Sequence, residues 1–114
     1  MVVRFLRTPD GQGPVEGFLD GLLPKDAQKV LWIFRLIERI ERVPVTYLRK
    51  LTGTQEIWEV RIQGTRQSYR GLGFHHRGTL GLTNGYSKKS RRTDRQQIAR
   101  AERLRADFIT AQRN

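Results

Sequence analysis

The chain has 114 residues, of which 37% are hydrophobic, contains no cysteine and carries a formal net charge of +11. This length suits one domain with a core of its own, so we expect a single domain over residues 1–114. The lack of cysteine excludes disulfides and thiolate metal sites. No apolar run reaches the roughly eighteen residues of a membrane span, and the N-terminal apolar stretch is too short for a signal peptide. We therefore expect a cytoplasmic protein without membrane contact.

The positive charge is concentrated in the second half of the chain. Residues 1–59 carry nine basic and eight acidic side chains, whereas residues 60–114 carry thirteen basic and three acidic ones. Most of the basic residues are arginine, whose planar guanidinium group fits a phosphate better than a lysine does. This asymmetry favours a nucleic acid as the partner. The alternatives are a solvated basic face or a surface that meets an acidic protein.

The N-terminal part of the sequence predicts one strand and two helices. Residues 2–6 read as a strand that ends at the turn residues 9–11. Residues 14–23 have apolar side chains at helical spacing, and a second helix begins at Pro24 and runs to about Arg42. Its apolar stripe is wide enough to pack the helix on a sheet.

After residue 44 the pattern changes from helical to alternating. We expect strands over residues 47–51, 57–62, 67–74 and 79–86, with His75-His76-Arg77-Gly78 as the last turn. Such short connections favour antiparallel pairing. Residues 88–92 are predicted to be loop, and Thr93-Asp94-Arg95-Gln96 has the form of a capping box that starts a final helix at Thr93. The expected fold class is α+β, with N-terminal helices packed on a twisted antiparallel sheet and a basic C-terminal helix.

Familiar catalytic motifs are missing from the sequence. It has no glycine-rich phosphate loop, no serine-hydrolase elbow and no cysteine nucleophile. His75 and His76 are neighbours on a strand and should point to opposite faces, so they are not expected to share a metal ion. We therefore expect neither a metal nor a cofactor.

Basic residues recur instead on three consecutive strand regions. They are Arg61, Arg66, Arg70, Lys88 and Lys89. RNA can be cleaved without a metal because its 2′-hydroxyl supplies the nucleophile. The protein must then align that hydroxyl, stabilise charge on the phosphate oxygens and move two protons. Guanidinium and ammonium groups suit the second of these tasks but are poor bases.

The residues for proton transfer are left open by the sequence. The candidates are Glu59, His75, Tyr86 and Lys88. Alternatively, the arginines only dock a nucleic-acid backbone or pair with nearby glutamates. Among the aromatic residues, alternation predicts Trp58 and Tyr69 as core, while Tyr86, next to the basic loop, could also stack on a base.

Five short motifs occur in an order that resembles a known family. They are Leu51-Thr52-Gly53, Ile57-Trp58-Glu59-Val60-Arg61, Ser68-Tyr69-Arg70, Gly85-Tyr86-Ser87-Lys88-Lys89-Ser90 and a helix from Thr93. Together they resemble the phage-derived branch of the RelE/HigB toxins over nearly the whole chain. The resemblance implies a bacterial type II toxin–antitoxin system, a compact RelE-like α+β fold, no cofactor, and cleavage of mRNA on the ribosome through 2′-hydroxyl attack. It also implies a cognate helix-turn-helix antitoxin as the partner.

The resemblance assigns roles to particular positions. Arg61 matches a basic strand residue that touches the substrate, Arg70 matches the arginine at the scissile phosphate, and Lys88 and Lys89 match the basic pair after the last strand. We therefore predict Arg61, Arg70 and Lys88 as catalytic, with Glu59 and His75 as candidates for proton transfer. The predicted RNA-binding residues are Arg66, Tyr86, Lys89, Ser90, Arg91 and Arg92.

Three positions depart from the pattern of the family. Tyr86 stands where the branch more often has Phe, Asp94 replaces a common Pro after the helix-capping Thr, and Glu59 stands at a position that is basic in some relatives, which leaves the acid and the base open. Alternation also places Arg70 on the strand face of Leu72 and Phe74, so it should be partly covered. Two alternatives belong to this prediction. One alternative is a ParE-like toxin that inhibits DNA gyrase by protein contact and cleaves no RNA. The other is a non-enzymatic, nucleic-acid-binding phage accessory protein.

Overall fold

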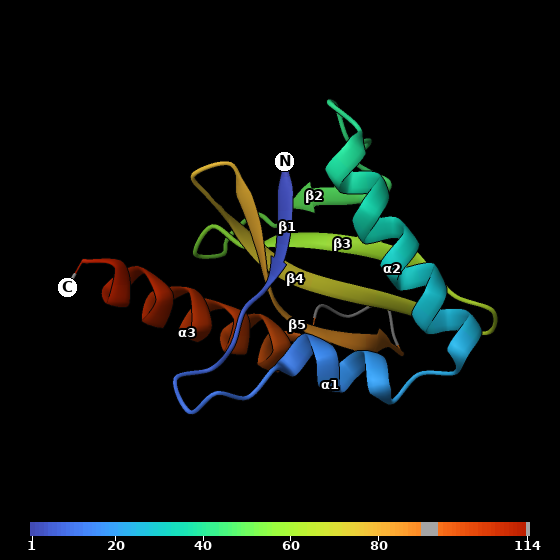
Figure 1. Cartoon of the computed structure of the whole chain (residues 1–114), viewed down its shortest axis with the longest axis horizontal. Coiled ribbons are helices and arrows are strands. Elements are labelled where there is room, and N and C mark those ends of the chain that lie inside the picture. Colours follow the sequence, from blue (N-terminus) through green and yellow to red (C-terminus); the bar gives the residue numbers. More distant parts are fainter. Residues whose placement is uncertain (90–93, 114) are drawn as a thin grey trace.

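The computed structural model describes residues 1–89 and 94–113 and has an α+β fold (Figure 1). The elements in chain order are β1 (Val2–Phe5), α1 (Pro14–Asp20), α2 (Pro24–Arg39), β2 (Leu48–Lys50), β3 (Trp58–Gln63), β4 (Ser68–His76), β5 (Thr79–Lys88) and α3 (Arg95–Gln112). The predicted fold class is confirmed: two N-terminal helices, a mostly antiparallel sheet and a basic C-terminal helix.

The five strands form one sheet in the order β1-β5-β4-β3-β2. Strands β2 to β5 are an antiparallel meander, as their short connections predicted. Strand β1 instead pairs in parallel with β5, with Val2 opposite Thr79 and Phe5 opposite Leu82. The sequence predicted β1 as a strand but carried no signal for this long-range pairing.

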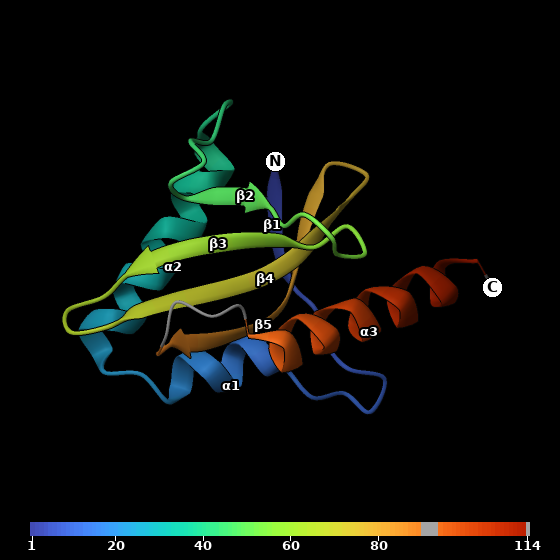
Figure 2. The ribbon, with the colours of Figure 1, turned by 180° about the vertical axis from the view of Figure 1, so that it is seen from behind.

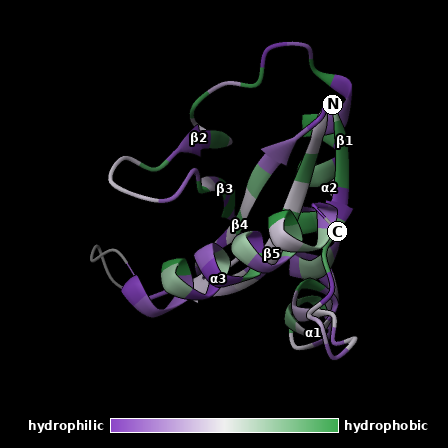
Figure 3. Ribbon diagram, turned by 90° about the vertical axis from the view of Figure 1, so that its left-hand side faces the viewer, coloured by the Kyte–Doolittle hydropathy of each residue, from purple (hydrophilic) through white to green (hydrophobic). Residues whose placement is uncertain are grey.

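Helices cover the two faces of the sheet unequally. Helices α1 and α2 pack on one face, where Val60 and Ile62 of β3 join the buried side chains of α2. Helix α3 packs on the other face, where Ile98 and Ala101 contact Leu72. Seen from behind, α3 crosses only one end of this face, and none of the helices of the described residues lies in front of the end that carries the last part of β3 and the first part of β4 (Figure 2). The α3 ribbon alternates between hydrophilic and hydrophobic bands (Figure 3), as expected for a helix with one buried side.

A β-bulge decides which side chains of β5 reach the α3 face. Leu72 pairs with Asn84 and Gly73 pairs with Leu82, so Thr83 is an extra residue in the ladder. The strands approach closely here: a Cβ on Gly73 would lie 2.4 Å from the carbonyl oxygen of Gly81. One extra residue reverses the alternation of side chains along a strand. Leu80 and Leu82 therefore join the buried side chains on the α2 face, whereas Tyr86 joins those on the α3 face.

Several predicted boundaries are corrected by the structure. Helix α1 ends at Asp20 rather than residue 23, and α2 ends at Arg39 rather than residue 42. Helix α3 begins at Arg95 with Asp94 as its N-cap, whose carboxylate accepts a hydrogen bond of 3.3 Å from the backbone N–H of Gln97. The predicted cap, Thr93, lies outside the described residues. At the other end of the basic segment, Lys88 is the last residue of β5 and not part of a loop.

The histidines belong to β4 and not to a turn. The turn consists of Arg77 and Gly78, both with positive φ, at 49° and 79°. His75 packs against Trp58 with 4.6 Å between ring centroids, and His76 packs against Phe108 at 5.1 Å. The two rings therefore contact different layers of the fold, as their adjacent strand positions predicted.

The predicted core aromatic residues are placed differently in depth. Tyr69 is fully buried, as expected, whereas Trp58 is half-buried and packs at the edge of the α2-side cluster.

Within residues 1–89 and 94–113, no helix is long and apolar enough to cross a membrane.

Candidate nucleic-acid interface

A row of polar side chains crosses four strands on the α3 face of the sheet. Arg49 of β2 lies opposite Glu59 of β3. Arg61 of β3 lies opposite Arg70 of β4, and Arg70 lies opposite Tyr86 of β5. Residues directly opposite one another share a face and lie within reach of each other. The alternation within β3 and the register between strands thus gather side chains from four separate segments.

The carboxylate of Glu59 lies at the centre of this row. Its Oε1 atom is 3.3 Å from Nε of Arg49 and 3.8 Å from Nε of Arg61, and its Oε2 atom is 3.5 Å from Nε of Arg70. The Glu59 side chain is only 8% exposed. We call these four residues the arginine cluster. One carboxylate against three guanidinium groups leaves an excess of positive charge, so the arginine cluster favours an anion.

The three arginines differ in depth. The side chain of Arg70 is 11% exposed, against 40% for Arg61 and 50% for Arg49. One Nη atom of Arg70 donates to the carbonyl oxygen of Tyr69 at 2.9 Å, which fixes the guanidinium group. Burial lowers the pKa of Arg70, while the charge of Glu59 acts in the opposite direction; an arginine remains protonated under such conditions. Arg70 is therefore a fixed, charged donor, and it is partly covered, as its strand position predicted.

Tyr86 closes the row on β5. Its ring is buried in the α3-side cluster with Ile98 and Ala101. Burial raises the pKa of Tyr86 to about 12, and the charges of Glu59 and Asp94 act in the same direction. The phenol is therefore protonated at neutral pH, and it can donate a hydrogen bond or a proton but is not a base there.

A cleft of about 450 Å³ begins at the arginine cluster and follows the open edge of β3. Strand β2 pairs only with Trp58 to Val60, and the last pairing contact is a 2.8 Å bond from the Arg61 N–H to the carbonyl oxygen of Tyr47. Beyond that point the edge of β3 is open. The cleft is lined by Lys29, Ile33, Thr46, Tyr47, Arg61, Ile62, Gln63, Ser68 and Arg70.

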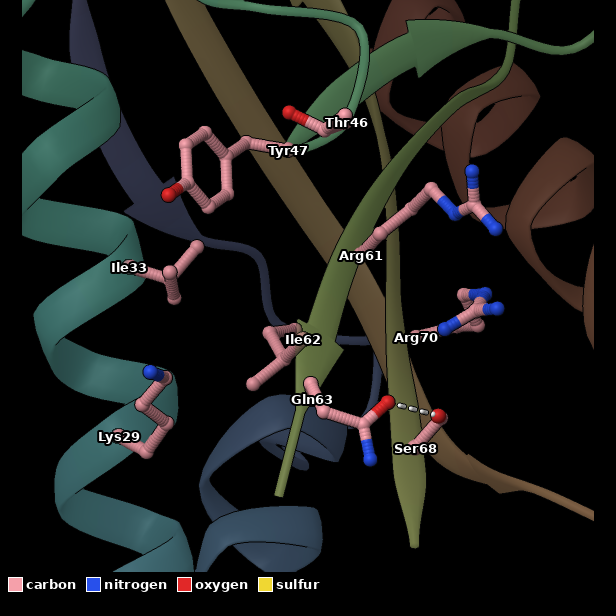
Figure 4. A pocket seen from close by; sticks show the side chains of 9 residues that line it. All are labelled: Lys29, Ile33, Thr46, Tyr47, Arg61, Ile62, Gln63, Ser68 and Arg70. Atoms are coloured by element: carbon pink, nitrogen blue, oxygen red, sulfur yellow. Dashed lines mark hydrogen bonds between the residues drawn. The ribbon is translucent and has the colours of Figure 1, made fainter.

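The cleft has two sides that differ in chemistry. Figure 4 shows Arg61 and Arg70 pointing to the same side of the sheet, near Gln63 and Ser68, while Ile33 and Ile62 lie on the other side of β3. The Ser68 hydroxyl donates to the Gln63 side-chain oxygen at 2.7 Å. One side is thus basic and polar, and the other carries Ile33 and Ile62 together with Lys29 and Tyr47.

Three further basic residues that the sequence predicts as RNA contacts lie at the same end of the sheet. Lys88 lies opposite Ser68, Lys89 follows β5 and is exposed, and Arg66 is exposed in the turn between β3 and β4. Asp26 of α2 anchors this turn, because its buried carboxylate accepts hydrogen bonds from the N–H and hydroxyl of Thr65 at 3.0 and 2.9 Å.

Asp26 also binds the core of the sheet. It accepts a hydrogen bond from the buried hydroxyl of Tyr69. This bond, together with those from Thr65, lowers the pKa of Asp26. The turn that carries Arg66 is therefore tied to both α2 and β4.

The structure does not bring every predicted residue to this place. His75 lies seven residues beyond Ser68, the first residue of β4, and contacts Trp58, away from the arginine cluster. Partial burial, and then the charge of the N-terminal amino group, lower the pKa of His75. Ser90, Arg91 and Arg92 lie outside the described residues.

Arg49 is the residue that the sequence analysis missed. The alternation around residues 47–51 placed it on a strand, but its role depends on the register between β2 and β3, which are separated by a seven-residue loop.

Across residues 1–89 and 94–113, no group of three or more histidine or acidic side chains could hold a metal ion. The donors of the arginine cluster are cationic and suit an anion instead.

The described residues thus form an α+β protein with an arginine-lined cleft at one end of its sheet. The protein is a member of the phage-derived Gp49-like family, a toxin-like family: the family model described as "Phage derived protein Gp49-like (DUF891)" matches residues 17–106. This range covers well over half of the chain and includes the whole arginine cluster. Among curated proteins, no sequence matches the chain significantly.

Proposed function

We propose that this protein is a RelE/HigB-type toxin of a type II toxin–antitoxin system and that it cleaves mRNA on the ribosome, in the cytoplasm, without a metal or a cofactor. The observation that carries the proposal is the arrangement of three guanidinium groups around one buried carboxylate on an open part of the sheet. Membership of a toxin-like family supports the toxin role. The charge excess in residues 60–114 supports an RNA substrate.

Binding of the scissile phosphate follows from the different depths of the arginines. Arg70 is fixed and buried, so it is a preorganised donor for a non-bridging oxygen. Arg61 is more exposed and can turn from Glu59 to the second non-bridging oxygen. Arg49 and Lys88 then contact the neighbouring backbone, and Arg66 and Lys89 extend the basic surface beyond the turn. Ser90, Arg91 and Arg92 stay candidates for the same backbone contact.

The cleavage step is a transfer within the RNA itself. The 2′-oxygen forms a bond to phosphorus while the bond from phosphorus to the 5′-oxygen breaks, which leaves a 2′,3′-cyclic phosphate and a 5′-hydroxyl. The 2′-hydroxyl proton passes to Glu59, and Tyr86 donates a proton to the departing 5′-oxygen. The arginines stabilise the charge that grows on the phosphate oxygens.

The partner proposed for the toxin is a cognate antitoxin with a helix-turn-helix domain, which would neutralise it. A gyrase inhibitor of the ParE type is the second candidate, and it requires no RNA cleavage. A non-enzymatic phage accessory protein is the third candidate. The three candidates predict different outcomes when expression is induced. An mRNA-cleaving toxin should stop translation first, a gyrase inhibitor should stop DNA replication first, and a non-enzymatic accessory protein should stop neither.

The test is Arg70→Ala, expressed from an inducible promoter beside the wild-type protein. We expect the variant to fold, to lose RNA cleavage and to lose growth arrest. The matched control is Arg35→Ala, since Arg35 is exposed on α2 and lies away from the cleft. Translation and replication are followed by labelled amino acid and thymidine, and RNA ends are mapped by primer extension. Cleavage by Arg70→Ala at the wild-type rate, or replication arrest without RNA cleavage, would overturn the proposal.

A further inference from the structure

A second cleft, of about 530 Å³, lies at the opposite end of β4 from Arg70. It is bounded by β1 and the residues after it, by the turn between β4 and β5, and by the C-terminal half of α3. His76 is six residues from Arg70 along β4, which corresponds to about 20 Å. The lining residues are Arg4, Phe5, Leu6, Arg7, Phe74, His76, Arg77, Thr79, Gly81, Phe108 and Gln112. The volume falls within the range of pockets that hold small organic ligands.

Aromatic rings form one part of this second cleft. The centroid of Phe108 lies 5.4 Å from that of Phe74 and 5.1 Å from that of His76. Phe74 is fully buried, whereas Phe108 and His76 are half-buried and so present ring surface. The guanidinium group of Arg105 lies 6.0 Å from the centre of the Phe74 ring. Such ring surface suits a flat, unsaturated ligand.

Positive charge forms the other part. Arg4 on β1 and Arg77 in the β4–β5 turn are both exposed, and among the described residues none that lines the second cleft is acidic. Arg7 is held by the carbonyl oxygen of Gly11 at 3.1 Å and by the carboxylate of Glu16 at 3.0 Å. The second cleft therefore combines one arginine that already has partners with two arginines that can turn toward an anion.

His76 adds a polar group that lacks a partner. Its Nε2 atom is buried, and the described residues offer it no hydrogen bond. A buried polar atom without a partner is unfavourable, so a ligand group that supplies a hydrogen bond there is favoured. Rotation about the second side-chain torsion of a histidine is soft, so the ring can turn this atom toward a group in the second cleft.

We propose that the second cleft binds one nucleotide of a single-stranded RNA, with the base against the His76 and Phe108 rings and the phosphate between Arg4 and Arg77. A nucleotide is the ligand that joins a flat ring to a phosphate, and this matches the two parts of the second cleft. An acidic peptide would engage the arginines but leave the ring surface without a stacking partner. This site is separate from the arginine cluster, and it does not depend on the nuclease activity of the protein.

The experiment uses the whole protein and adenosine 5′-monophosphate as the probe, with inorganic phosphate as a second probe. Binding is followed residue by residue in ¹H–¹⁵N spectra, which separate this site from the arginine cluster. We expect signals of Arg77, Gly78 and Thr79 to shift on titration with the nucleotide. Two variants report on the two parts of the second cleft: Arg77→Gln for the phosphate and Phe108→Leu for the base. The control is Arg35→Gln, which removes the same charge from a distant surface.

The expected results differ between probes. Arg77→Gln should weaken both nucleotide and phosphate at this site by about tenfold, as the loss of a charge-assisted hydrogen bond does. Phe108→Leu should weaken the nucleotide by roughly fivefold and leave phosphate unchanged, because only the base uses the ring. Absence of shifts around Arg77 at millimolar nucleotide would overturn the proposal. So would equal effects of Arg77→Gln and Arg35→Gln, or equal losses of nucleotide and phosphate binding in Phe108→Leu.

Discussion

The Nε atom of Arg70 lies 3.5 Å from the Oε2 atom of Glu59, and both side chains are almost completely buried on the α3 face of the sheet. A buried ion pair is costly to break by removing one partner, since the other charge is left without compensation. Glu59 therefore holds Arg70 in place, but its negative charge also opposes an anion that binds beside the guanidinium groups. Removal of this charge should lower the stability of the fold and strengthen anion binding.

We expect Glu59→Gln to lower the free energy of unfolding by about 2–3 kcal/mol, because Arg70 loses its counter-charge. The same variant should bind inorganic phosphate roughly tenfold more tightly, since a negative charge is removed beside the guanidinium groups. RNA cleavage should fall, because the proposed proton acceptor is lost. Urea unfolding, calorimetric titration with phosphate and a cleavage assay measure the three effects.

The control for this variant is Glu56→Gln. Glu56 pairs with Lys50 at 2.7 Å, but both side chains are well exposed. A surface pair of this kind contributes little, so stability should change far less than in Glu59→Gln. Phosphate binding that is unchanged or weaker in Glu59→Gln would contradict the role given to the Glu59 carboxylate.

Arg70→Lys tests whether the planar fork of the guanidinium group is needed as well as its charge. A lysine keeps the charge but cannot donate to the carbonyl oxygen of Tyr69 and to a phosphate in the same fixed geometry. We expect cleavage to fall about 10²-fold, as it does when one preorganised donor is removed from an active site. Arg61→Lys, at the more exposed position, should lose about tenfold or less. Equal losses in the two variants would show that the depth of Arg70 has no functional meaning.

Arg66 is expected to contribute to affinity through charge alone. It is exposed in the turn between β3 and β4, away from the centre of the arginine cluster. Arg66→Ala should weaken RNA binding to a similar extent for all sequences and reduce the slope of log affinity against log salt by about 1. Fluorescence anisotropy between about 50 and 200 mM salt measures that slope. A slope equal to that of the wild type would place Arg66 outside the RNA contact.

The sequence predicts which side chains share a face within a strand and that β2 to β5 pair antiparallel, but it does not predict the register between the strands. Alternation placed Glu59 and Arg61 on one face of β3 and Val60 on the other, because one face has to be buried. The position of Arg49 beside Glu59 depends on the register across the loop from Leu51 to Ile57, and no local pattern encodes it.

The β-bulge in β5 and the strand position of the two histidines depend on contacts between strands that no local sequence pattern predicts. The extra residue Thr83 reverses the alternation of β5 and so brings Tyr86 to the face of Arg70. Its physical basis is the close approach of Gly73 and Gly81, which becomes visible only when the strands are paired. The sequence predicts the two histidines as turn residues, but they pair with Leu80 and Thr79 of β5 and so extend β4.

Asp26 should make the stability of the fold sensitive to acid. Hydrogen bonds from Tyr69 and Thr65 lower the pKa of Asp26 below its ordinary value of 3.8. The stabilisation is therefore fully present above pH 3.8 and is lost as the pH falls through the lower pKa of the folded state. Asp26→Asn should be less stable than the wild type at pH 7 and should lose less stability than the wild type on acidification. The control is Asp20→Asn at the exposed end of α1, and a pH profile of Asp26→Asn parallel to that of the wild type would contradict this assignment.

Tyr86 is expected to act as a proton donor, so Tyr86→Phe should slow cleavage about tenfold to a hundredfold with little change in KM. It should also change the stability at high pH. Because burial raises the pKa of Tyr86 to about 12, the unfolded chain loses this proton near pH 10 while the folded protein keeps it. The free energy of unfolding of the wild type therefore falls as the pH rises from about 10 toward 12.

In Tyr86→Phe this decline should be shallower, since the variant has no proton to lose at position 86. Tyr69 also has a raised pKa, chiefly because it is buried and then because it donates to Asp26, and it is present in both proteins. Its contribution therefore cancels when the two profiles are subtracted. Urea unfolding at pH 8, 10 and 11 gives the comparison, and identical profiles would mean that the phenol of Tyr86 is not desolvated in the way its donor role requires.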